Sequence, residues 1–187
     1  FIGSFVPALV FGVAVGNVML GAPFRLDSDL RSFYEGTLLG LFSPFTLICG
    51  LLSVCMLVLH GAAWLSIKGE QGPVLHRARA IGTVAGLLSL VLFAVGGLFI
   101  AFGDIGFRIT GALDTAGFSN PLRTTVEAAP GAWMDNYGLY PWMIIAPVLG
   151  FLGAAAGLIG MWRRSPALAF GGSSASAVGI ISTVGLS

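Results

Sequence analysis

Residues 80–103 read AIGTVAGLLSLVLFAVGGLFIAFG, a run of 24 residues without one charged side chain. About 20 apolar residues in a helix cross the 30 Å hydrocarbon core of a bilayer. Four further stretches share this length and this lack of charge: 3–21, 44–67, 141–162 and 167–187. All nine Lys and Arg and all eight Asp and Glu lie outside the five stretches. The pattern predicts a membrane protein with five spans.

The composition supports helical spans. The chain is 56% hydrophobic and 9% charged, whereas soluble domains are about 25% charged. The apolar stretches are continuous rather than alternating, and only helices or closed barrels satisfy the backbone in lipid. We therefore expect an all-α fold, a polytopic transmembrane helical bundle that forms a single domain over 1–187. A net charge of +1 gives no reason to expect nucleic-acid binding.

Small residues four apart recur in three of the stretches and predict close helix packing. In membranes, such pairs let two helix backbones approach each other. The pairs are Gly12 with Gly16, Gly82 with Gly86, and Gly153 with Gly157. This spacing is common in membrane bundles and does not identify the neighbouring helix.

The loops predict an orientation. The short connections 68–79 and 163–166 contain five of the nine Lys and Arg, whereas the long connections 22–43 and 104–140 contain seven of the eight acids. The positive-inside rule places the short basic loops in the cytoplasm and the two long loops outside. The chain begins without Met and ends within an apolar stretch, so we expect part of a longer subunit.

Local signals predict the ends of some elements. Ser43 before Pro44 is typical of a helix start, with a capping hydroxyl and Pro at the first helical position. In the first long loop, Asp27 and an apolar stripe predict a short interfacial helix over 27–40. The stripe contains Leu30, Phe33, Tyr34 and Leu38.

Residues with chemical potential are few. His60 in the second span has two interpretations: an axial haem ligand, or a neutral side chain that either bonds across helices or reaches toward the cytoplasmic interface. We favour the second. His76 is expected to be solvated in the basic loop and Asp104 at the end of the third span, and Asn17 and Asn136 are polar but isolated. Cys49 and Cys55 lie six residues apart on one helix, too far for a disulfide, and are expected to pack. We find no nucleophile–base pair, metal cluster or phosphate loop.

Ordered motifs make the chain resemble subunit II of cytochrome bd-type quinol oxidases. The resemblance covers nearly the whole chain, and several of its motifs are polar or lie in loops. Its first part consists of Phe1-Ile2-Gly3-Ser4-Phe5-Val6-Pro7, Gly12-Val13-Ala14-Val15-Gly16-Asn17, Gly21-Ala22-Pro23-Phe24 and Phe33-Tyr34-Glu35-Gly36. Its second part consists of Ser43-Pro44-Phe45, Gly50-Leu51-Leu52-Ser53-Val54, His60-Gly61-Ala62, Arg77-Ala78-Arg79, Ser119-Asn120-Pro121-Leu122 and Gly131-Ala132-Trp133.

The resemblance implies a respiratory enzyme of the bacterial or archaeal cell membrane. In this family, quinol is oxidised and dioxygen is reduced to water, with formation of a proton gradient. Haems b and d and the quinol site belong to subunit I, against which subunit II packs; subunit II is also associated with a bound quinone. The resemblance transfers no catalytic residue, cofactor ligand or metal ligand to this stretch. It therefore predicts a non-haem scaffold that is not catalytic by itself.

Two other functions are compatible with a helical membrane bundle. A secondary transporter requires a broken span or a polar site at the midplane. Here Pro7 and Pro147 interrupt spans without converging polar neighbours. The other alternative is an accessory membrane subunit that serves assembly without a role in turnover.

Overall fold

The computed structural model of the chain describes residues 2–111 and 125–186. Five long helices dominate it: α1 (Ile2–Leu20), α2 (Pro44–Lys68), α3 (Pro73–Phe102), α5 (Ile145–Trp162) and α6 (Pro166–Leu186). Short helical turns lie at η1 (Leu39–Leu41), η3 (Ala132–Met134), α4 (Asp135–Leu139) and η4 (Pro141–Ile144). The strands are β1 (Phe24–Leu26), β2 (Ser32–Tyr34), β3 (Phe107–Ile109) and β4 (Val126–Ala128). The predicted all-α membrane bundle is confirmed, since five described helices are long and apolar enough to span a bilayer.

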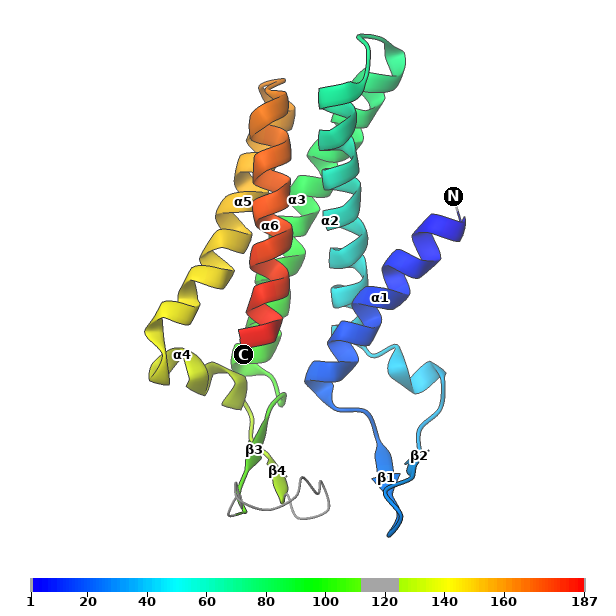
Figure 1. Ribbon diagram of the computed structural model, residues 1–187, viewed down its shortest axis with the longest axis vertical. Helices are drawn as coiled ribbons and strands as arrows, with labels where there is room; N and C mark the ends of the chain where they lie inside the picture. The colour runs from blue at the N-terminus through cyan, green and yellow to red at the C-terminus, as the bar shows by residue number, and fades with distance from the viewer. Residues whose placement is uncertain (1, 112–124, 187) are drawn as a thin grey trace.

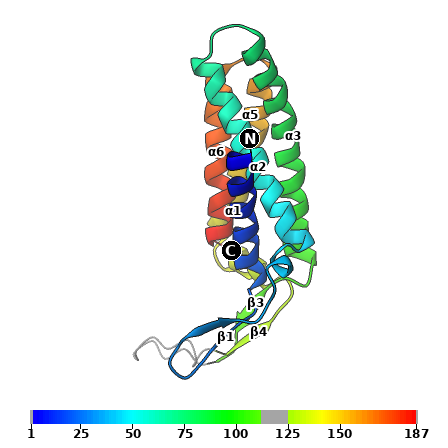
Figure 2. The same ribbon diagram turned by 90° about the vertical axis from the view of Figure 1, so that its right-hand side faces the viewer.

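The long helices stand side by side, with two small hairpins at one end (Figures 1 and 2). Helices α2, α3, α5 and α6 form the body of the bundle, and the most extensive contact is between α5 and α6. Helix α1 packs chiefly on α2 and leans away from the other helices (Figure 1). The short connections α2–α3 and α5–α6 lie together at the end opposite the hairpins, so both basic connections meet there.

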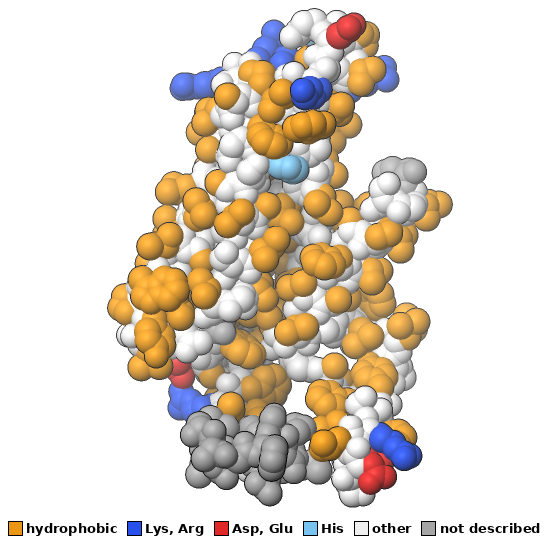
Figure 3. Space-filling view, viewed as in Figure 1, with side chains coloured by type: hydrophobic (Ala, Val, Ile, Leu, Met, Phe, Trp, Pro, Cys, Tyr) orange, Lys and Arg blue, Asp and Glu red, His pale blue; other side chains and the backbone are white. Residues whose placement is uncertain are grey.

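Charged side chains gather at the two ends of the bundle, and the band between them is largely hydrophobic (Figure 3). Large apolar side chains face outward along this band, as Leu87, Leu152 and Val178 do with more than half of their surface exposed. In water this surface would be unfavourable, whereas lipid tails solvate it. The protein is an integral membrane protein.

Helix starts follow the predicted signals in one case and depart from them in another. The Ser43 hydroxyl accepts a hydrogen bond from the amide of Thr46, with Pro44 at the first helical position, as predicted. Helix α3, however, begins at Pro73 rather than at residue 80. Arg77 and Arg79 therefore lie on its first turns instead of in a loop, because charged residues at a helix end remain within reach of water.

The predicted close packing at glycines is confirmed for all three pairs. A Cβ added to Gly12 would lie 2.7 Å from the Cα of Gly50 in α2, and one added to Gly82 would lie 2.7 Å from the Cβ of Ala62. On Gly153 it would lie 2.8 Å from the Cα of Ser176 in α6. Real Cβ atoms do not approach this closely. Glycine is therefore what allows these backbones to touch, which explains the extensive α5–α6 contact.

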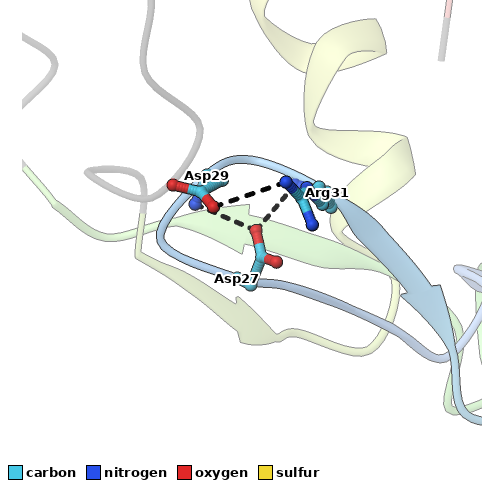
Figure 4. Close-up of polar contacts among 3 residues, drawn as sticks. All are labelled: Asp27, Asp29 and Arg31. Atoms are coloured by element: carbon cyan, nitrogen blue, oxygen red, sulfur yellow. Dashed lines mark hydrogen bonds and ion pairs between the residues drawn. The ribbon is translucent and has the colours of Figure 1, made fainter.

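The predicted interfacial helix over 27–40 is wrong. The segment is instead a hairpin of β1 and β2, in which Phe24 pairs with Tyr34 and Leu26 with Ser32. One carboxylate oxygen of Asp27 accepts hydrogen bonds from the amides of Asp29 and Arg31, each at 2.9 Å, and closes the turn (Figure 4). The Asp residue that we interpreted as a helix cap therefore caps a turn, a role that suits the same short acceptor.

Pairing across the first hairpin explains why strands form. Arg25 reaches Glu35 at 3.0 Å, and its guanidinium lies 5.6 Å from the centre of the Phe33 ring. Aromatic residues favour strands when a partner strand is present. Residues 24–26 supply that partner strand. The apolar stripe that predicts a helix takes account of residues 27–40 only and does not include this partner.

The second long loop also forms a hairpin. Strand β3 pairs with β4, with Phe107 opposite Ala128, and Arg108 forms an ion pair with Asp135. The predicted motif Ser119-Asn120-Pro121-Leu122 lies outside the described residues. Trp133, from the motif that follows, packs against a small core of Met19, Phe45 and Ile105. The two long loops thereby close the same end of the bundle.

Candidate functional site

His60 bonds across helices, which is one of the two outcomes that the favoured interpretation allowed. It lies on α2, and its Nδ1 is 3.0 Å from the hydroxyl oxygen of Ser173 on α6. The Ser173 hydroxyl donates to the carbonyl of Phe170 at 3.0 Å, so we assign the proton of the imidazole to Nδ1, which donates to Ser173. The Phe170 ring packs 5.0 Å from the imidazole and 5.6 Å from Trp64, one helical turn beyond His60.

The described contacts give His60 a structural role within the bundle. One nitrogen of His60 is bonded to Ser173, and Phe170 packs beside the imidazole. Within residues 2–111 and 125–186, His, Cys, Asp and Glu form no group of three that could hold a metal ion. We therefore derive no step that passes through a haem at His60.

An apolar cavity lies nearer the hairpin end, between α2, α3, α5 and α6. Its volume is about 220 Å³, below the roughly 300–1,000 Å³ of pockets that enclose drug-sized ligands. The lining is almost entirely apolar and includes Phe45, Phe93, Pro147 and Ile180. Such a space suits a small apolar molecule or a segment of a hydrocarbon chain, since it offers little to orient a polar group.

The two cysteines are free, as predicted. Cys49 lines the apolar cavity, and Cys55 lies on the side of α2 that faces α3. Neither belongs to a described cluster of metal-binding side chains. Both contribute to helix packing in the manner of small apolar residues.

Asn17 was expected to be isolated, and this prediction is wrong. Its amide nitrogen donates to the carbonyl of Val13 at 2.8 Å and to the carbonyl of Leu41 in η1 at 2.9 Å. The hydroxyl of Thr46, a fully buried residue of α2, donates to the same Leu41 carbonyl at 2.8 Å. This node joins α1, η1 and α2. The pairing of a polar residue in the first span with a carbonyl in the loop was not visible in the sequence.

The remaining predicted polar residues lie at the ends of the spans. Asp104 is exposed just after α3, and His76 is exposed on the first turns of α3. Asn136 lies in α4, in the loop between the last strand and α5. The structure does not bring these three residues together with His60, so the bundle has no single polar centre among the described residues.

The geometry therefore shows a closely packed apolar bundle whose interhelical ties are made by neutral groups. The family model for cytochrome bd terminal oxidase subunit II matches residues 1–187. The chain belongs to this family. Its match extends over every described helix and both hairpins.

Curated relatives agree with the family. The chain is 38% identical over 186 residues to the cytochrome bd-I ubiquinol oxidase subunit 2 of Escherichia coli K12. It is 34% identical over 187 residues to the probable cytochrome oxidase subunit 2 of Haemophilus influenzae Rd. In both cases 100% of this chain and 49% of the relative are covered, so the chain spans about half the length of these relatives. The comparisons do not support a secondary transporter.

Family motifs now have structural roles. Gly12 and Gly16 of the second motif pack on α2, and Asn17 ends that motif with its bond to η1. Ser43 caps α2, and His60 ties α2 to α6. The glycines, Asn17 and His60 each hold two elements together, and Ser43 starts a helix, which indicates that the motifs serve the architecture of the subunit in this half.

Proposed function

We propose that this chain is part of subunit II of a membrane oxidase that oxidises quinol and reduces dioxygen to water. The observation that carries the proposal is the identity of 38% to the Escherichia coli subunit across the whole chain. The family model supports it over the same residues. The activity belongs to the assembled oxidase, in which proton uptake and release on opposite sides of the membrane form a gradient.

Within that oxidase we propose that the chain is a scaffold against the haem-bearing partner subunit. The charged side chains lie at the ends of the bundle, and the described polar contacts within the spans are hydrogen bonds between neutral groups (Figure 3). A bundle of this kind supplies a rigid apolar wall, because close packing at glycine leaves few alternative arrangements. The resemblance to the family assigns haems b and d to the partner.

The His60 assignment is tested by its effect on haem content. We expect the His60→Ala variant of the full-length subunit, purified with its partner, to keep all haem absorption bands at wild-type intensity per complex. The substitution should instead lower the unfolding free energy of the complex by about 1–2 kcal/mol, because the Ser173 hydroxyl loses the hydrogen bond from His60. Ser173→Ala is the matched control, since it removes the other half of the same bond. Disappearance of one haem from the His60→Ala complex alone would contradict the scaffold assignment.

The sidedness of the loops remains our proposal. We propose that the end containing Lys68, Arg77 and Arg164 is cytoplasmic, because five of nine Lys and Arg gather in its two short connections. A cysteine introduced at Gln71 should resist a membrane-impermeant thiol reagent in intact cells and react in inverted vesicles. A cysteine introduced at Ser28, in the hairpin turn, should show the opposite pattern. Labelling of the Gln71 position in intact cells would reverse the orientation.

A further inference from the structure

A second cavity lies at the basic end of the bundle. Its volume is about 230 Å³, several times the roughly 30 Å³ that a water molecule occupies in the liquid. The α2–α3 connection, the first turns of α3 and the α5–α6 turn form its walls. His76, Arg79 and Arg164 line it, together with the polar side chains of Gln71 and Thr83.

Arg79 is the decisive residue. Its Nε is completely buried and has no hydrogen-bond partner, and no ion pair among the described residues involves its guanidinium. An arginine without an acid partner among the described residues favours an anionic ligand at the part of its side chain that lines the cavity. None of the residues that line the cavity is acidic. Glu70, the one acid at this end of the chain, lies in the exposed connection beside the cavity and not in its wall.

The backbone adds to the positive character of the cavity. Helix α3 starts beside it, at Gly72 and Pro73, and no side chain caps that start. The first amides of the helix, those of Val74 and Leu75, line a neighbouring cavity that Glu70 also lines, so the helix contributes to the basic cavity only through the macrodipole of its 30 residues. Arg164 stands in the left-handed backbone region, at φ 57°, where glycine is usual. Glycine would satisfy the backbone conformation at this position, so the cationic side chain of Arg164 is not needed for the turn.

The level of the cavity relative to the membrane interface indicates which kind of anion can reach it. Trp162, which lines the cavity, is 79% exposed, and Trp64 lies at the same end of the bundle at 49% exposed. Indole rings concentrate where lipid headgroups meet the hydrocarbon core. The cavity therefore opens at the level of phospholipid phosphates. Basic pockets between membrane helices bind anionic headgroups, and a choline or ethanolamine cation beside Arg164 would oppose binding.

We propose that this cavity binds the phosphate of an anionic phospholipid, with Arg79 as its central ligand and Arg164 and His76 at its rim. The bound lipid would bridge the α2–α3 and α5–α6 connections, which both line the cavity. The inference does not depend on the activity of the oxidase, because it rests on charge, burial and position alone.

The test uses the full-length subunit in its complete complex. Native mass spectrometry after titration with phosphatidylglycerol should show one tightly retained lipid, and the same titration with phosphatidylcholine should show at least tenfold weaker retention. Arg79→Gln should weaken phosphatidylglycerol retention about tenfold, since it removes one charge-assisted contact. Arg77→Gln is the matched control: Arg77 is exposed on the same helix, is absent from the cavity wall, and carries the same charge. It should change retention less than twofold.

Two further arms separate a lipid from a free anion and binding from folding. If millimolar inorganic phosphate displaces phosphatidylglycerol completely, the site belongs to a soluble anion and the lipid assignment is overturned. Arg164→Gly suits the left-handed backbone, so it should keep or raise thermal stability while weakening lipid retention severalfold. Equal losses of phosphatidylglycerol retention in Arg79→Gln and Arg77→Gln would overturn the site, and so would unchanged retention in Arg164→Gly. Arg79→Lys should restore part of the binding, because it keeps the charge.

Discussion

Replacing Gly172 with alanine should destabilise the bundle by about 2–3 kcal/mol, whereas the same change at its neighbour Gly171 should be neutral or stabilising. A Cβ on Gly172 would lie 2.9 Å from the Cβ of Ala156 and 2.7 Å from its carbonyl carbon, so α5 and α6 would have to separate. A Cβ on Gly171 would meet no atom within 4 Å. In a helix, alanine otherwise gains about 0.5–1 kcal/mol over glycine.

The two adjacent positions are expected to change the unfolding free energy in opposite directions, so each variant is a control for the other. Both variants have the same composition, the same helix and the same change in intrinsic helix propensity. The measurement is the unfolding free energy of the purified complex in mixed micelles, compared with wild type. Equal effects at Gly171 and Gly172 would show that the α5–α6 contact does not depend on close approach of the backbones.

Removing both donors to the Leu41 carbonyl should cost more than the sum of the single changes. Asn17→Leu and Thr46→Val each leave the other donor in place, so each should cost about 1 kcal/mol. The double variant leaves the carbonyl without either bond near the membrane boundary, and we expect a loss of about 3 kcal/mol or more. A double-mutant cycle on the unfolding free energy measures the excess.

The same cycle distinguishes a polar node from general packing. Thr46→Val preserves shape, so its effect reports the hydroxyl, and Thr46→Ser should retain most of the stability because it keeps the donor. Additive losses within about 0.5 kcal/mol would show that Leu41 finds another donor, and the node would then lose its assigned role.

The five spans could be predicted because each residue makes its own contribution to insertion. One charge at a helix centre costs about 2.5–3.5 kcal/mol, so a 24-residue stretch without charge already specifies a span. The start of α2 was predictable for a similarly local reason, since Ser43 and Pro44 act within one turn. The start of α3 was not, because Arg77 and Arg79 are tolerated at a helix end that reaches water.

The first hairpin shows where local reasoning failed. Leu30, Phe33 and Tyr34 fit a helical stripe equally well, and Asp27 suits a helix cap or a turn. The choice depends on residues 24–26, which provide the second strand. Pairing of this kind joins residues six to ten positions apart, so it cannot be predicted from residues 27–40 alone.

For the candidate sites too, individual residues could be predicted from the sequence, but their partners could not. The sequence identified His60 as the polar residue of the second span, and a bond across helices was one of the two favoured expectations. Its partner Ser173 is 113 positions away and was not predicted. Arg77 and Arg79 are indistinguishable as members of one motif. The structure separates them, because residues two apart on a helix face different sides: Arg79 lines the basic cavity and Arg77 does not.

Five membrane-crossing helices and a resemblance to the bd-oxidase subunits could be read from the order of the amino acids alone. Both conclusions rest on residue-by-residue properties, namely the cost of burying charge and the order of motifs. The folded arrangement was needed to show which glycines meet a backbone, which carbonyl Asn17 binds and which arginine lines the basic cavity. These contacts depend on pairs of atoms that the fold brings within a few ångströms, and such distances cannot be derived from a single stretch of sequence.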